Sequence, residues 1–189
     1  MNRSTVKGYL GELLLKKHLE DQGMHVRHLG NQSGYDLLAT FGTEQFRIDV
    51  KMSLPKDEFR WGSEYWGWAL RHESKKRKVS ASHLVCIGCT THLELASIFV
   101  IAADDVEKFP PGEGQFAKVL NGFVAPCGKT FNETVAGKDN RYIGSRSALK
   151  DGRVIQVPLK ESLLEALRAT ASPTKKPRRR SSGVSKAED

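Results

Sequence analysis

Two short stretches of the chain, residues 34–38 and 46–51, hold charged side chains at a spacing that favours metal-assisted hydrolysis. In the second stretch apolar residues alternate with charged ones, which is the period-two pattern of a β-strand. Asp49 and Lys51 therefore lie on the same face of that strand, and Asp36 opens the strand before it. Two carboxylates and one ammonium group at a strand pair are the minimum for binding a divalent cation and handling a proton. The chemistry that needs such a set is hydrolysis of a phosphodiester bond.

The order of these residues resembles the PD-(D/E)xK nuclease superfamily, the restriction-endonuclease-like and Holliday-junction-resolvase-like enzymes. In that family a helix with a glutamate comes first, and here Glu12 lies in a helical stretch. Asp36 follows, and thirteen residues later comes the tripeptide Asp49-Val50-Lys51. Tyr35 stands where the family name has proline. The resemblance spans residues 4 to 52.

The resemblance implies a Mg²⁺ site, with Mn²⁺ as the alternative cation. It makes Asp36 and Asp49 metal ligands, adds the main-chain carbonyl of Val50, and places Glu12 at the metal directly or through a water. Lys51 would orient or deprotonate the attacking water and stabilise charge on the phosphate. The implied catalytic set is thus Glu12, Asp36, Asp49 and Lys51. The competing interpretation is a surface strand with a solvated Asp/Lys pair, which contributes little to stability.

The hydrophobic pattern predicts elements that would position this set in an α/β (α+β) domain with a central mixed sheet flanked by helices. The resemblance implies the same layout, a restriction-endonuclease-like core. Ser4 is a predicted N-cap and Gly23 a predicted helix stop. Residues 110–153 show no readable pattern. We expect a domain over residues 1–170 and a disordered basic tail over 171–189. The predicted helices cover 4–22, 104–109 and 159–169, and the predicted strands cover 24–28, 34–38, 46–51, 66–68, 82–90, 96–102 and 154–157.

The charge of the chain points to a polyanionic partner. Thirty basic side chains face 22 acidic ones, a net charge of +8. In the last eighteen residues six Lys and Arg face two acids, so six minus two leaves +4 there. A basic body with a strongly basic end suits nucleic acid, and we expect DNA rather than RNA. The alternative interpretation is that the positive surface charge only keeps the protein in solution.

Candidate nucleic-acid contacts follow the predicted catalytic strand. Trp66 and Trp68 share one strand face and are expected in the core, while the role of Trp61 stays open. The residues predicted to grip phosphates are Arg60, Arg71, Lys75, Lys76, Arg77 and Lys78.

Three cysteines do not make a disulfide framework and indicate a reducing compartment. Cys86 and Cys89 would point to opposite faces of a strand, which disfavours a zinc site with His92 and Cys127. The expected location is the cytoplasm, at the nucleoid in a bacterium or phage, or the nucleus in a eukaryote. No membrane span is predicted.

The sequence thus predicts a metal-dependent nuclease, and the resemblance adds a homodimer in which each protomer cuts one strand. Two alternatives remain. One is a nucleic-acid-binding protein on the same fold without catalysis. The other is an interaction or assembly protein of a mobile element, in which Glu12 would lie far from Asp36 and Asp49.

Overall fold

The computed structural model describes residues 3–29, 34–56, 64–72, 80–111, 119–127 and 140–170. The tail over 171–189, Trp61, Arg60 and the four basic residues Lys75, Lys76, Arg77 and Lys78 lie outside the described residues. None of the helices in the described ranges is long and apolar enough to cross a membrane.

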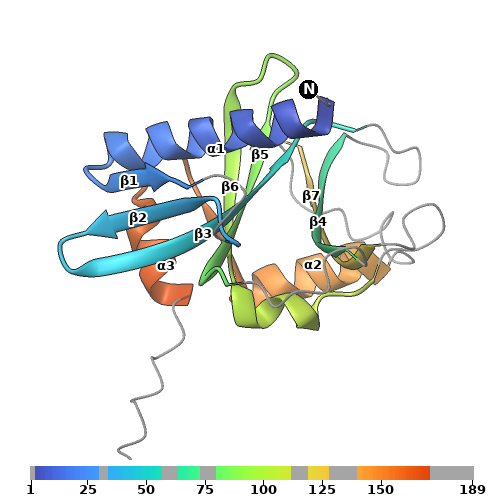
Figure 1. Ribbon diagram of the computed structural model, residues 1–189. Coiled ribbons are helices and arrows are strands. Elements are labelled where there is room, and N and C mark those ends of the chain that lie inside the picture. Colours follow the sequence, from blue (N-terminus) through green and yellow to red (C-terminus); the bar gives the residue numbers. More distant parts are fainter. Residues whose placement is uncertain are drawn as a thin grey trace, which may run out of the picture.

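Three α-helices, one 3₁₀ helix and eight strands make up the described chain, and Figure 1 shows their arrangement. The helices are α1 (Arg3–Asp21), η3 (Ala103–Lys108), α2 (Asn140–Lys150) and α3 (Leu163–Thr170). The strands are β1 (His25–His28), β2 (Leu37–Phe41), β3 (Glu44–Ser53), β4 (Tyr65–His72), β5 (His83–Cys89), β6 (Leu95–Ala102), β7 (Val119–Pro126) and β8 (Val154–Val157).

A mixed six-stranded sheet runs through the molecule in the order β1-β2-β3-β5-β6-β8. Among the described strands only β3 and β5 pair in parallel, since the chain between them leaves the sheet to form β4. β4 pairs with β7 in a separate two-stranded sheet. The mixed α+β class with helices around a central sheet is therefore confirmed.

Two hydrophobic cores lie on opposite sides of the six-stranded sheet. One packs α1 and α3 against it, for example through Leu15 and Leu167. The other packs the β4–β7 pair and α2 against the opposite side, through Trp68 and Ala148 among others. All seven residues of β5 are buried, because this strand is covered on both sides.

The predicted burial of Trp66 and Trp68 is confirmed, with 5% and 4% of their surfaces exposed. Their indole N–H groups donate to the carbonyls of Cys89 and Ile87 at 3.0 and 3.2 Å. Trp66 lies against Gly88, where a Cβ atom would come within 2.5 Å of the indole ring.

Several sequence predictions are refined by the structure. Cys86 and Cys89 are buried in different cores, on opposite sides of β5 as predicted. The closing helix starts at Leu163 rather than residue 159. The unreadable segment 110–153 contains β7 and α2.

Candidate active site

β3 sorts its side chains onto two sides, as its alternation predicts. Phe46, Ile48 and Val50 are buried under α1 and α3. Asp49 and Lys51 point to the other side, where both are half-buried. The Lys51 ammonium donates to Oδ1 of Asp49 at 2.5 Å. The predicted acid–lysine pair is thus formed on the side of the sheet away from α1.

Asp36 joins this pair from the end of the neighbouring strand. The last residue pair between β2 and β3 is Leu37–Ile48, and Asp36 comes directly before it. The Asp36 amide still donates to the Ile48 carbonyl at 2.9 Å. Its side-chain Oδ2 accepts the Val50 amide at 2.7 Å, an N–H that a longer β2 would have paired. The carboxylate therefore sits where β2 and β3 part.

The electrostatics around Asp36 are those of a site short of positive charge. Burial raises the pKa of Asp36 to about 6. The hydrogen bond from Val50 lowers that pKa, the Asp49 and Glu12 carboxylates raise it, and the Lys51 ammonium lowers it. All four predicted catalytic residues are therefore close enough to influence one charge.

Two glycines allow the backbone approaches that build the site. Gly34 has a φ of 73° and leads into Asp36, and a Cβ atom there would lie 2.5 Å from the Ser80 hydroxyl. Gly11 lies on the face of α1 that meets β3, where a Cβ atom would lie 2.7 Å from Cβ of Met52. The helix can therefore come close enough to place Glu12 beside the end of β2.

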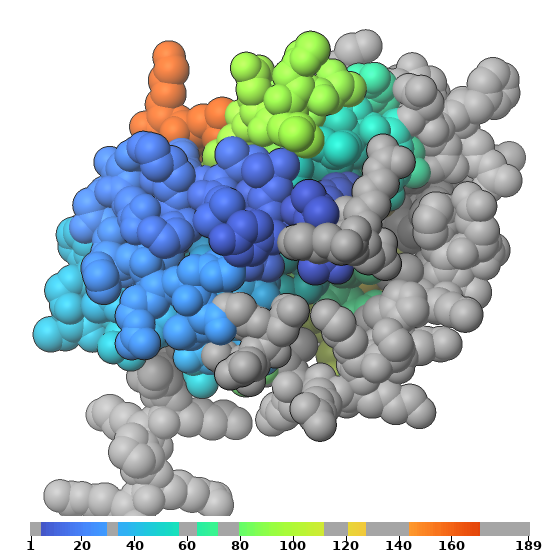
Figure 2. All heavy atoms as spheres, turned by 45° about the horizontal axis from the view of Figure 1, so that its top comes forward, coloured from blue at the N-terminus to red at the C-terminus, as the bar shows by residue number. Residues whose placement is uncertain are grey.

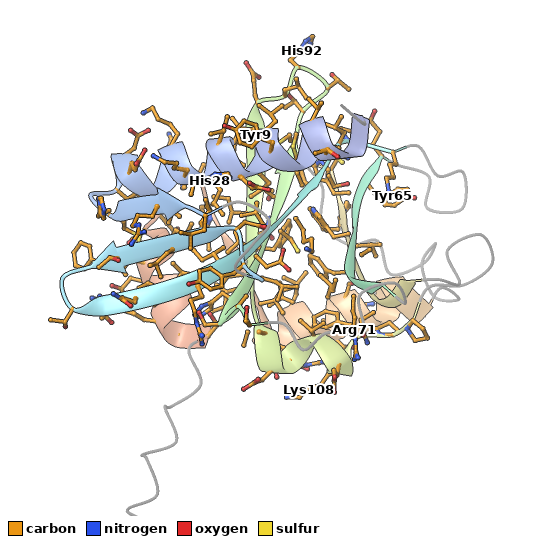
Figure 3. The ribbon with its side chains drawn as sticks, in the orientation of Figure 1. Tyr9, His28, Tyr65, Arg71, His92 and Lys108 are labelled. Atoms are coloured by element: carbon orange, nitrogen blue, oxygen red, sulfur yellow. The ribbon has the colours of Figure 1, made fainter. Side chains whose placement is uncertain are left out.

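Glu12 has a partner that the sequence did not identify. Its Oε2 is hydrogen-bonded to Nε2 of His28, and the imidazole lies nearly perpendicular to the ring of Tyr9, with 5.3 Å between the ring centroids. Figure 3 shows Tyr9 on α1 above His28 on β1. One indication of this pair is present in the sequence. His28 follows the buried Val26 by two residues, so its side chain points to the same side of β1, toward α1.

The chemistry of the donor set fits a magnesium ion held by few protein ligands. One oxygen each of Asp36 and Asp49 makes the hydrogen bonds described above, and neither second oxygen has a partner in the described part of the chain. Mg²⁺ usually binds one or two carboxylates and keeps waters and substrate phosphates as its other ligands. Within the described ranges no group of three or more His, Cys, Asp or Glu side chains is arranged to hold a metal ion. Asp36 and Asp49, together with the main-chain carbonyl of Val50, which follows Asp49 in the chain, match this coordination by few protein ligands.

Cys86 lies next to the acid–lysine pair, on the neighbouring strand β5. It is the register partner of Lys51 on β5 and is fully buried. Burial raises the pKa of its thiol, while the Lys51 ammonium lowers it and the Asp49 carboxylate raises it. Cys86 is therefore a neutral thiol that packs under the pair rather than a nucleophile.

Arg71 is the predicted phosphate contact that the structure describes. It lies on β4, and its Nη1 donates to Oε1 of Glu107 at 2.8 Å. Figure 3 shows it beside Lys108, at the 3₁₀ helix and far from Tyr9. Its role as a phosphate contact stays a prediction.

Comparison with known proteins gives a fold likeness. No family model and no curated protein sequence matches the chain. Eight chains of solved structures match. One is a bacterial homing endonuclease, I-Ssp6803I, with 15% sequence identity and a TM-score of 0.48 over 80% of this chain and 99% of that one. At this identity and TM-score the likeness says nothing about activity.

Proposed function

We propose that the protein is a Mg²⁺-dependent nuclease of the PD-(D/E)xK type, an endonuclease that hydrolyses DNA rather than RNA. The observation that carries this proposal is the position of Asp36 and Asp49, which lie next to the last residue pair between β2 and β3. Lys51 is hydrogen-bonded to Asp49. A purely structural Asp–Lys pair does not need the second, half-buried carboxylate, Asp36, whose pKa is raised to about 6. A bound cation would offset the free-energy cost of a charged Asp36 carboxylate at this position.

Each residue has a separate task in this proposal. The cation would be held by Asp36, Asp49 and the Val50 carbonyl, and it supplies charge neutralisation and an activated water. The Val50 amide fixes the Asp36 carboxylate. Lys51, held by Asp49, is placed to orient the water and to stabilise negative charge on the phosphate. Glu12, which is hydrogen-bonded to His28, would contact the cation directly or through a water, and its carboxylate raises the pKa of Asp36.

The proposal also concerns where and with what partner the protein works. We propose that it works in the cytoplasm, at a nucleoid or in a nucleus, where a nuclease meets nucleic acid. A homodimer that cuts both strands stays a prediction, and sedimentation equilibrium with and without a DNA duplex tests it.

The test is cleavage of labelled duplex, single-stranded and branched DNA, and of RNA, with Mg²⁺, Mn²⁺ or chelator. The variants are Asp49→Asn and Lys51→Met, and the matched control is Asp21→Asn, an exposed acid that is also paired with a lysine. We expect cation-dependent cutting that falls at least about 100-fold in both site variants and stays unchanged in the control. Binding without cutting on any substrate would leave the non-catalytic alternative. Cutting that both site variants retain would overturn the assignment of the site.

A further inference from the structure

One side of the β1–β2–β3 ribbon is exposed and polar. The side chains that point toward α1 and α3, such as Val26, Ala39 and Ile48, are buried. The alternate side chains point the other way, and four of them are exposed: His25 and Arg27 on β1, and Gln45 and Arg47 on β3. We call this surface the open face, and its residues are His25, Arg27, Leu38, Thr40, Gln45 and Arg47.

The strand register places two arginines next to the acidic pair. Arg27, Leu38 and Arg47 form one row across the three strands. Asp36 and Asp49 lie on the same side, two residues along β2 and β3, which is about 7 Å. The open face therefore leads directly to the candidate active site, with Arg27 and Arg47 about 10 Å apart across two strand spacings.

Both arginines present positive charge that the fold does not use. Neither guanidinium has a carboxylate partner within the described ranges. The nearest acid outside the site on β3, Glu44, points to the other side and pairs with Arg168 of α3. Apart from Asp36 and Asp49, the outward positions of these three strands carry no acid.

The backbone of Arg47 is held by hydrogen bonds, although its side chain is exposed. Its amide donates to the Ser82 hydroxyl at 2.9 Å, and its carbonyl accepts the Ser82 amide at 2.8 Å. β5 starts at the next residue, so the base of the arginine is fixed by the central sheet. Ligand binding would therefore restrict only the rotamers of the Arg47 side chain and not its backbone.

We propose that the open face binds the sugar-phosphate backbone of a nucleic acid, with Arg27 and Arg47 contacting phosphates beside the one that is cut. This inference rests on the proposed nuclease function, because the acidic pair marks where the strand must pass. Two carboxylates repel a polyanion, and flanking guanidinium groups offset that repulsion while offering a planar fork that matches phosphate oxygens.

The test uses the full-length chain and equilibrium binding of a labelled DNA duplex in chelator over a range of salt concentrations. The variant is Arg27→Gln/Arg47→Gln. The matched control is Lys17→Gln/Lys108→Gln, which removes the same charge from side chains that are 72% and 58% exposed elsewhere. We expect a loss of about ten-fold per arginine and a salt slope smaller by about two, with the control close to wild type. Arg27→Lys/Arg47→Lys should keep the slope, and thermal melting checks that each variant is folded.

Equal losses in the arginine variant and its control would overturn the inference, since net charge alone would then explain the binding. Unchanged affinity in the arginine variant, or no duplex binding by the wild type at low salt, would also overturn it. Cleavage by the wild type with Mg²⁺ is scored separately. Cutting together with unchanged binding would reject the open face and keep the nuclease. Arginine-dependent binding without cutting would reject the nuclease and keep the open face.

Discussion

At the residue scale, the charge of Asp36 is costly to the folded protein when no cation is bound. Its pKa is raised to about 6 mainly by burial, whereas an unfolded chain has a value of about 3.9. A raised folded-state pKa contributes stability that is fully present below about pH 4 and is lost as the pH rises through about 6.

Asp36→Asn should therefore stabilise the cation-free protein near pH 8 and leave it almost unchanged near pH 3. The gain is about 1–2 kcal/mol after allowance for the partial exposure of the carboxylate. Urea unfolding in chelator at both pH values measures it. Asp151→Asn is the control of opposite sign, because a side-chain hydrogen bond from Arg153 lowers the pKa of Asp151. A loss of stability at pH 8 in Asp36→Asn would contradict the expectation.

Mg²⁺ should reverse the order of stability of the wild type and Asp36→Asn. An ion that binds only the folded wild type stabilises it, by about 2.7 kcal/mol at a hundred times its Kd. We expect the wild type to melt at a higher temperature as Mg²⁺ is added, and Asp36→Asn and Asp49→Asn to show no such rise. A rise of equal size in all three proteins would place the cation elsewhere.

The Glu12–His28 pair should contribute more than an ordinary surface pair, since the side chains are only 14% and 24% exposed. A double-mutant cycle with Glu12→Gln and His28→Ala should give a coupling energy of about 1–3 kcal/mol in urea unfolding. The matched cycle on Lys16 and Glu20, a more exposed pair on the same helix, should give less than about 1 kcal/mol. Equal coupling in the two cycles would make Glu12 an ordinary helix residue.

At the element scale, the contact between α1 and β3 depends on Gly11. Gly11→Ala should destabilise the protein by about 1–3 kcal/mol, because the added Cβ atom would lie 2.7 Å from Cβ of Met52. Gly8→Ala is the matched control, as nothing lies within 4 Å of its Cβ position, and it should stabilise the helix by up to about 1 kcal/mol. Both effects are read from urea unfolding. Stabilisation by both substitutions would show that the helix does not need this close approach.

Local patterns predicted the elements that have a strong period or a clear end. The alternation from Phe46 to Lys51 predicted which side of β3 is charged, and the spacing of Trp66 and Trp68 predicted their burial. Pairings between distant segments left no local trace. β4 was predicted as a strand, but its partner β7 lies about 50 residues later, and α2 (Asn140–Lys150) has few large apolar residues to mark a face.

The same limit applies to the candidate site. The order of Glu12, Asp36 and Asp49 could be matched to a family because it is a property of the chain. The bond between Glu12 and His28, and the use of Asp36 to satisfy the Val50 amide, depend on how α1 and β2 meet β3. Neither could be inferred before the three elements were placed.

At the scale of the whole molecule, charge is distributed between the described body and the tail. Figure 2 shows α1 lying across one side of the molecule beside the β5–β6 turn, so the open face is on the other side of the sheet from this helix. Any strand that reaches the acidic pair must therefore approach from the side away from α1.

Deletion of residues 171–189 should weaken duplex binding and reduce its salt dependence without lowering the melting temperature. The tail carries six basic and two acidic side chains and has no apolar face to bury. Fluorescence anisotropy and thermal melting measure the two effects. A tail of equal length with its Lys and Arg changed to Gln separates charge from length. A fall in melting temperature on deletion would show that the tail packs on the body.

The burial of β5 on both sides of the sheet has a consequence for how the protein unfolds. Leu84 and Cys86 belong to one core and Val85 and Ile87 to the other, so neither core can come apart without disturbing this strand. Its backbone amides should thus be the last to exchange with deuterated solvent, at a rate set by global unfolding. Lys51, which is paired with Cys86 across the ladder, is anchored in this slowest-exchanging region, whereas Asp36 stands at the end of a short strand that can fray.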